Sequence, residues 1–255
     1  MFGRHNQQLG FVSRGDPNSG LYIIMLLLLA TQVFSGRSLP PTKQIVTVLG
    51  CFIVAVAVHE FMHAFVALKL GDNTAERQGR VTLNPSSHFE PFGFFGMVMI
   101  SLGYNFIGWG KPVPVNPARL NAPGRLFDGR HGMVLVALAG PLSNVAMAAV
   151  AAIPIHMMWD DSAARSGDLF YVVTWFFWVN ALLASFNAIP IPPLDGYRIL
   201  VGVLPSFWIR ILAPLERYGF LILILLFFIG NRIGSSSVTS EMISPIRELI
   251  YRLLP

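Results

Sequence analysis

Charged residues are scarce in this chain. Of its 255 residues only 12% are Asp, Glu, Lys or Arg, whereas ordinary soluble domains contain about 25%. Hydrophobic residues make up 54% of the sequence, and no polar stretch is long enough to form a separate soluble module. This composition argues against a soluble enzyme and predicts an integral membrane protein.

Cysteine is almost absent as well. The one cysteine, Cys51, excludes an intrachain disulfide. It lies eight residues before His59, about 12 Å along a helix axis, which is too far for the two to bind one ion. We therefore expect Cys51 to be a small side chain buried in helix packing.

A basic stripe interleaved with aromatic residues, as nucleic-acid binding would require, is also absent. The net charge is +5, but the basic residues are scattered over the loops between apolar runs. Such a distribution is expected for loops that contact anionic lipid headgroups. We therefore exclude a nucleic-acid partner and expect the lipid bilayer as the surroundings.

Long hydrophobic runs, in contrast, are plentiful. A helix needs about 20 apolar residues to cross a bilayer, and six runs reach or approach that length. They cover residues 21–34, 45–70, 92–109, 133–159, 169–189 and 207–229. The sequence predicts an all-α membrane protein, a multi-spanning helical bundle with about five to six membrane segments.

The domain organisation follows from these runs. We predict a polar N-terminal tail at residues 1–19 and one integral membrane domain over residues 20–230, with its core at about 45–205. Residues 231–255 form a C-terminal tail. Its charged and apolar residues suggest an amphipathic helix on the membrane surface.

The second apolar run contains the motif His59-Glu60-Phe61-Met62-His63. Residues four apart lie on one face of a helix, so His59 and His63 can bind one ion together. Glu60 is then placed to accept a proton from a water at that ion. Two imidazoles and a carboxylate in hydrocarbon cost several kcal/mol unless they are paired or coordinated. The membrane setting therefore favours metal binding over a chance match.

A third ligand is needed, because a catalytic zinc site has three protein ligands and an open position for water. A histidine six residues after the motif is excluded, since that position is Lys69. Glu76 and Glu90 lie in the polar segment after the run. Asp195 is the stronger candidate, because it follows a proline-broken turn at the end of an apolar run. Its alternative role is the N-cap of a helix that begins near Tyr197.

Residues 71–130 differ from the rest of the chain. Residues 80–83 alternate like a short strand, and the prolines in 112–117 impose extended backbone. If Asp195 shares an ion with the two histidines, this segment must begin and end on the same membrane side. We therefore predict a short β-hairpin or re-entrant element after the second span, with residues 92–109 dipping into the membrane and returning.

Three further histidines have no ligand spacing. His88 lies beside the predicted strand, and we interpret it as a solvated loop residue. His131 and His156 lie near the ends of apolar runs, and we interpret them as interfacial.

Charge in the loops predicts the orientation. The loop at residues 160–168 has three aspartates and only Arg165. By the positive-inside rule we predict a multi-pass protein of the cell membrane whose metal site opens toward the cytoplasm, although Arg37 and Lys43 fall on the other side. The basic residues on the predicted cytoplasmic side are Arg77, Arg80, Lys111, Arg119, Arg125, Arg130, Arg198, Arg210 and Arg217.

Three elements, in this order, resemble the site-2 protease family of intramembrane zinc metalloproteases. They are His59-Glu60-x-x-His63, the stretch from Gly140 to Asn144, and Asn187 followed by Leu194-Asp195-Gly196. The resemblance spans most of the chain, and its last element is the most specific. The middle loop also looks like that of compact bacterial members, which lack an inserted peptide-binding domain.

The resemblance implies one Zn²⁺ per chain, bound by His59, His63 and Asp195, with Glu60 as general base. The implied reaction is hydrolysis of peptide bonds in or near transmembrane segments. The implied partner is therefore a membrane-protein substrate with a transmembrane helix. The oligomeric state and the identity of the substrate stay open.

Two asparagines take roles from the resemblance. It implies that Asn187 helps to hold the substrate or the developing oxyanion, and that Asn144 lies near the active centre.

Two alternatives belong to other classes of protein. One is a membrane transporter or channel that uses His59, His63 and Asp195 as an ion-transit site, because ionisable residues in a membrane also mark ion pathways. The other is an inactive scaffold of the same fold. It is disfavoured because all the motif residues needed for activity are present.

Overall fold

A computed structural model describes residues 30, 38–104, 106–120 and 129–233. The chain divides into two units, Met1–Ser38 and Leu39–Pro255, and the following concerns the second. The predicted N-terminal tail, all of the first apolar run but Ala30, and residues 234–255 lie outside the described part. The predicted domain bounds stay a prediction.

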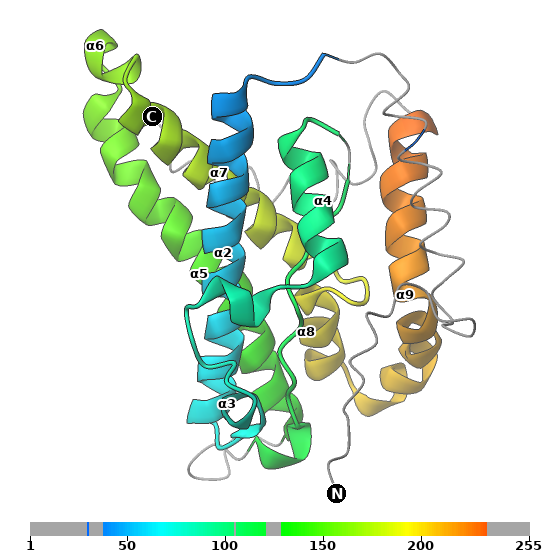
Figure 1. Cartoon of the computed structure of the whole chain (residues 1–255). Coiled ribbons are helices and arrows are strands. Elements are labelled where there is room, and N and C mark those ends of the chain that lie inside the picture. Colours follow the sequence, from blue (N-terminus) through cyan, green and yellow to red (C-terminus); the bar gives the residue numbers. More distant parts are fainter. Residues whose placement is uncertain (1–29, 31–37, 105, 121–128, 234–255) are drawn as a thin grey trace, which may run out of the picture. The chain divides into compact units, whose positions relative to one another are not determined.

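Within the described residues, three helices are long and apolar enough to cross a membrane: α2 (Thr42–Lys69), α5 (Gly129–Met158) and α7 (Asp168–Asn187). They have 28, 30 and 20 residues, against the roughly 20 that a bilayer requires. α5 packs along both α2 and α7, and α2 also contacts α7 (Figure 1). The prediction of a mostly helical membrane protein is confirmed, while the count of five to six segments is not.

Alanine is the commonest buried residue where α5 packs against α7. Small side chains let two helix backbones approach closely, which favours helix association in a membrane. Phe177, which is fully buried, belongs to the same cluster. The alanines are Ala148, Ala151 and Ala152 on α5, and Ala181 and Ala184 on α7.

The segment after α2 contains the short elements α3 (Thr74–Arg77), η1 (Pro85–His88) and α4 (Pro91–Ser101). With 11 residues, α4 is about 16 Å long and too short to cross a bilayer. It ends in a turn at Gly103, whose φ of 82° lies in the left-handed region that glycine tolerates best.

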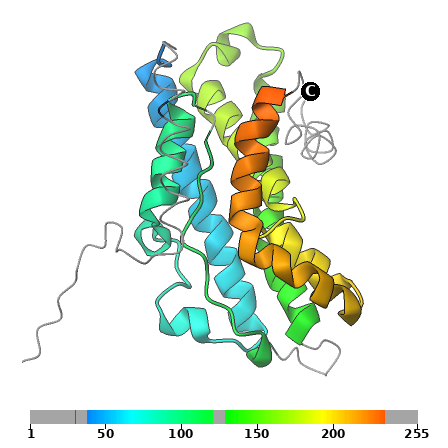
Figure 2. The same cartoon turned by 90° about the vertical axis from the view of Figure 1, so that its right-hand side faces the viewer.

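After Gly103 the chain returns beside α4. A Cβ added to Gly96 would lie 1.9 Å from the carbonyl oxygen of Ile107, and one added to Gly93 would lie 1.9 Å from that of Trp109. Residues 91–104 and 106–116 thus pair as one helix and one extended segment that runs back beside it (Figure 2). The dip of these segments into a membrane stays a prediction.

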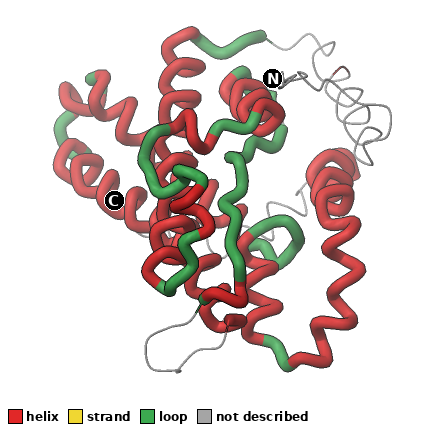
Figure 3. Tube along the Cα trace, turned by 60° about the horizontal axis from the view of Figure 1, so that its bottom comes forward, coloured by secondary structure: helices red, strands yellow, loops and turns green. Residues whose placement is uncertain are grey.

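The predicted β-hairpin is not found, because the described residues contain no strand. Residues 80–84 form bends and loop, and the returning segment is extended loop (Figure 3). Pro112 and Pro114 lack an amide donor, so this segment cannot form a continuous ladder. Its amide at Lys111 does donate to the carbonyl of His88, over 2.8 Å.

Prolines prevent α7 from continuing as a helix past its C-terminal end. Residues 190–193 contain three of them, and α8 (Asp195–Val203) begins directly afterwards. Gly196 packs tightly there, since a Cβ on it would lie 2.2 Å from the carbonyl oxygen of Ala188. α8 lies against α5 and leads into α9 (Ser206–Ile233), a 28-residue helix over the sixth apolar run. The short α6 (Ser162–Arg165) links α5 and α7.

Asp72 joins the chain just after α2 to the returning segment. This fully buried residue accepts hydrogen bonds from the amide of Thr74 over 3.0 Å and from the amide of Asn116 over 2.6 Å. The hydroxyl of Thr74 also donates to it. Burial raises the pKa of Asp72, but these hydrogen bonds outweigh that effect and hold the pKa below its ordinary value.

The Asp72→Asn variant should be less stable than the wild type by about 1–3 kcal/mol, because a neutral amide accepts fewer hydrogen bonds than a carboxylate. Since the folded-state pKa is lowered, the stability that Asp72 contributes is present above the unfolded pKa of about 3.9 and is lost as the pH falls below it. Melting temperatures in detergent between roughly pH 3 and pH 7 measure the difference. The exposed Glu76→Gln is the control, and a difference independent of pH would contradict the account.

Candidate metal centre

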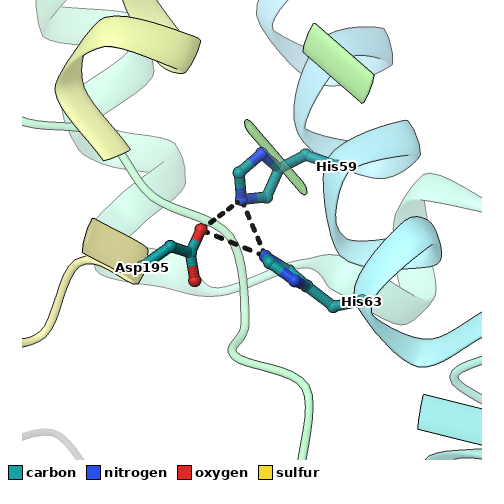
Figure 4. Close-up of side chains that lie close together, drawn as sticks. All are labelled: His59, His63 and Asp195. Carbon is teal, nitrogen blue, oxygen red and sulfur yellow. Dashed lines mark hydrogen bonds and ion pairs between the residues drawn. The ribbon is translucent and has the colours of Figure 1, made fainter. Parts of the chain in front are cut away.

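His59, His63 and Asp195 meet in the interior (Figure 4), and each offers one ligand atom within 4.8 Å of the others. The two Nε2 atoms are 3.0 Å apart, and Oδ2 of Asp195 lies 3.1 Å from Nε2 of His59 and 3.2 Å from Nε2 of His63. Ligand atoms around a tetrahedral zinc at 2.0–2.1 Å are about 3.3 Å apart. Two imidazoles and a carboxylate at this spacing therefore fit Zn²⁺.

The other ring nitrogens of the histidines fix their tautomers. Nδ1 of His63 lies 2.7 Å from the carbonyl oxygen of Val136, which only accepts, so Nδ1 carries the proton. Nδ1 of His59 donates to Oδ1 of Asn144 over 2.6 Å. Both Nε2 atoms thus keep a lone pair for an ion, an arrangement usual for metal-binding histidines.

Asn144 belongs to a chain of buried amides that links the three spanning helices. Its Nδ2 donates to Oδ1 of Asn180 over 2.9 Å, and Asn180 donates in turn to the carbonyl of Phe176 over 2.8 Å. Both asparagines are fully buried. Asn144 therefore acts through His59 as a positioning residue. Asn180 was missed by the sequence analysis, although an amide in an apolar run was a signal for it.

The carboxylate of Asp195 is turned toward the histidines. It is the first residue of α8, whose N-cap is Leu194 with no side-chain capping bond, so the predicted alternative of an N-cap is not what the structure has. Of the other acidic candidates, Glu90 caps α4 by accepting from the amide of Gly93, and Glu76 is exposed.

Gly140 on α5 leaves the space that an ion would need. A Cβ on it would lie 2.3 Å from Nε2 of His63 and 2.6 Å from Nε2 of His59. Both distances are far below van der Waals contact, so any side chain at this position would displace an ion or the imidazoles. The lack of a side chain at Gly140 is therefore a steric requirement of the site.

Glu60 lies under the returning segment. It is half-buried, and a Cβ on Gly110 would lie 3.3 Å from its Oε1 and 2.6 Å from Cγ1 of Val56. Only glycine lets the backbone pass this close. The returning segment therefore covers Glu60, which lies one residue after His59 and three residues before His63.

A buried arginine holds that segment in place. Nη2 of Arg80 donates to the carbonyl of Lys111 and lies 3.5 Å from Nδ1 of His88, whose Nε2 donates to the carbonyl of Thr82 over 2.8 Å. His88 is only 3% exposed, so its interpretation as a solvated loop histidine was wrong. Burial lowers the pKa of Arg80 and the nearby carboxylate of Glu60 opposes this, with a net lowering. From the sequence, Arg80 was interpreted as part of a short strand and as a basic residue of the predicted cytoplasmic side, and its burial was not predicted.

Asn187 is not brought into this cluster by any hydrogen bond that the described residues make. Its Nδ2 donates over 3.0 Å to the carbonyl of Leu183 in its own helix. The role toward substrate that the resemblance implies for Asn187 stays a prediction, as does zinc binding by the two histidines and Asp195.

Comparison with known proteins adds an independent finding. The protein named "Putative zinc metalloprotease YwhC" of Bacillus subtilis is 37% identical over 179 residues, which is 69% of this chain and 77% of that protein. The chain belongs to peptidase family M50. The family's sequence model matches residues 151–229. "Putative zinc metalloprotease Rip2" of Mycolicibacterium smegmatis is 30% identical over 220 residues, or 80% of this chain and 78% of that protein.

The M50 assignment confirms the resemblance to the site-2 proteases. No solved structure matches the chain significantly. For this M50 family member, the names of the relatives and the cluster of two histidines and Asp195 point to the same chemistry.

The Gly140→Ala variant should lose bound zinc, because its methyl group would enter the space between the two Nε2 atoms. We expect its zinc content, measured by elemental analysis of purified protein, to fall at least about tenfold, comparable to the loss of a residue that positions a ligand. Gly50→Ala is the matched control, since nothing lies within 4 Å of its added Cβ. Full zinc content in Gly140→Ala would contradict the proposed position of the ion.

Proposed function

We propose that this M50 family member is a zinc-dependent endopeptidase that hydrolyses peptide bonds in or near transmembrane segments of other membrane proteins. The observation that carries the proposal is the convergence of His59, His63 and Asp195 on and beside helices apolar enough to cross a membrane. The relatives' names as zinc metalloproteases support hydrolysis over an ion-transit role. We propose one zinc per chain.

The protein residues divide the chemistry between them. Zinc held at this site would polarise the peptide carbonyl and make a water more acidic. Glu60, adjacent in sequence to His59, takes a proton from the attacking water and delivers it to the leaving amine. His59, fixed by Asn144, and His63, fixed by Val136, present their lone pairs without rearrangement.

A transmembrane substrate must be locally unwound, because a helix hides its carbonyl groups in its own hydrogen bonds. The ligands are largely shielded from their surroundings, as His59, His63 and Asp195 are each only 6% exposed. The unwound segment therefore enters beneath the returning segment that covers Glu60. Asn187, at the end of α7, is the proposed amide donor to the substrate or to its developing oxyanion.

The proposed orientation places the metal site toward the cytoplasm. α3 and α6 lie at opposite ends of the spanning helices (Figure 1). The α3 end carries exposed Arg77 and Arg119, whereas the α6 end carries the aspartates of residues 160–168. Lys43, one of the basic residues at the α6 end, forms an ion pair with Asp168, which offsets its charge. The positive-inside rule then favours a cytoplasmic α3 end in the cell membrane.

The Glu60→Gln variant tests the reaction. It should keep its zinc, because Glu60 is not a ligand, and should lose cleavage by about 10²–10⁴-fold, the usual contribution of a general base. Fragments of membrane proteins in cells that express the wild type or the variant are compared by mass spectrometry, with zinc measured on the purified proteins.

Glu76→Gln, which alters an exposed glutamate, is the control and should behave as the wild type. His59→Ala and Asp195→Ala should lose both zinc and cleavage. Unchanged fragments in the Glu60→Gln cells would exclude the proposed general base. Graded changes in ion flux with no change in fragments would indicate a transporter instead.

A further inference from the structure

A second feature lies beside the metal centre: a cavity of about 140 Å³ between α2, η1 and α4. Three residues of α2 form one wall and two residues of α4 form the opposite wall. Trp109, from the returning segment, also lines the cavity. The principal lining residues are Ile53, Val56, Ala57, Phe94, Met97 and Trp109.

The cavity lies close to Glu60 along α2. Val56, in the cavity wall, lies one helical turn before Glu60 on the same face of α2. The backbone of Gly110 contacts both side chains, and the neighbouring Trp109 lines the cavity. The cavity therefore begins about 6 Å along α2 from the proposed general base.

The polar groups in the cavity wall are already used. His88 donates to the carbonyl of Thr82 and lies within hydrogen-bonding reach of Arg80, while Glu90 accepts from the amide of Gly93. Because these side chains already have hydrogen-bond partners in the protein, an occupant of the cavity need not supply polar groups. The rest of its lining is mainly aliphatic and aromatic, so it favours an apolar occupant.

The walls are also fixed in place. Both backbone groups of Lys111 are hydrogen-bonded. Its amide donates to the carbonyl of His88, and its carbonyl accepts from Arg80. This fastens the segment with Trp109 to η1. Phe89 and Phe94 pack with ring centroids 5.2 Å apart. A cavity with fixed walls selects its occupant by size.

We infer that this cavity is a specificity pocket for a large aliphatic or aromatic side chain of the substrate, one to two residues from the cleaved bond. An extended peptide advances about 3.3 Å per residue, so a residue at that distance reaches the cavity when the cleaved bond lies at Glu60. A cavity of about 150 Å³ holds a benzene ring, which is close to this volume. The inference rests on the proposed function.

Ile53 offers a clean test, because it lies in the cavity wall seven residues before Glu60 and belongs to neither the ligands nor the general base. Ile53→Phe adds bulk to the pocket, and Ile53→Ala enlarges it. Val54→Phe is the matched control, since it adds the same ring at the next position, which is 48% exposed and does not line the cavity.

The probe is a pooled library of synthetic apolar peptides with randomised residues, incubated with zinc-loaded protein in detergent. Mass spectrometry then identifies the cleaved bonds. The wild type should prefer Leu, Ile or Phe at one position beside the cleaved bond. Ile53→Phe should lower the ratio of Leu or Phe to Ala at that position by about tenfold or more, and Ile53→Ala should raise the ratio of Phe to Leu. Val54→Phe should keep the wild-type profile.

An unchanged profile in Ile53→Phe, or an equal loss for all peptides, would overturn the inference. Native mass spectrometry that finds a phospholipid lost in Ile53→Phe, with an unchanged profile, would assign the cavity to lipid. Capture of the same library by zinc-loaded Glu60→Gln supplies a readout without cleavage. One outcome separates the two proposals. If the wild type cleaves no peptide, while the peptides captured by Glu60→Gln show the size preference, the proposed function fails and the pocket stands. Captured peptides without that preference overturn the pocket.

Discussion

The structure depends on one electrostatic constraint: three atoms that could each bind a metal ion through a lone pair lie close together in the protein interior. The Nε2 atoms of His59 and His63 and Oδ2 of Asp195 lie 3.0 to 3.2 Å apart, and each residue is 6% exposed. Both histidines use Nδ1 as the donor, so in the neutral imidazole each Nε2 presents a lone pair toward the carboxylate. Such a group is costly to bury unless a cation compensates it.

The surrounding fold serves this constraint. Asn144 and Asn180 link α2, α5 and α7 through amides that end on His59, and Gly140 keeps α5 from filling the space of the ion. The prolines before Asp195 allow α8 to start where its first carboxylate meets the histidines. On the other side of α2, the bonds of Arg80 and Asp72 hold the returning segment against Glu60.

The sequence predicts those features that depend on local patterns. Helical spacing is enough to pair His59 with His63, and apolar run lengths are enough to predict α2, α5 and α7. The strand at residues 80–83 was a wrong prediction, because alternation over four residues says nothing about a partner, and prolines in the facing segment prevent a ladder. The burial of Arg80 and His88 was not predictable either, since it depends on the carbonyl of Lys111, distant in sequence, lying beside them.

The central claim is that two imidazoles and one carboxylate hold a zinc ion inside the helices. X-ray absorption at the zinc edge of the purified, zinc-loaded protein tests it most directly. The account predicts four light ligands at about 2.0–2.2 Å, two of them with imidazole scattering, in tetrahedral geometry. Sulfur at about 2.3 Å, six-fold coordination, or a spectrum without imidazole scattering would contradict it.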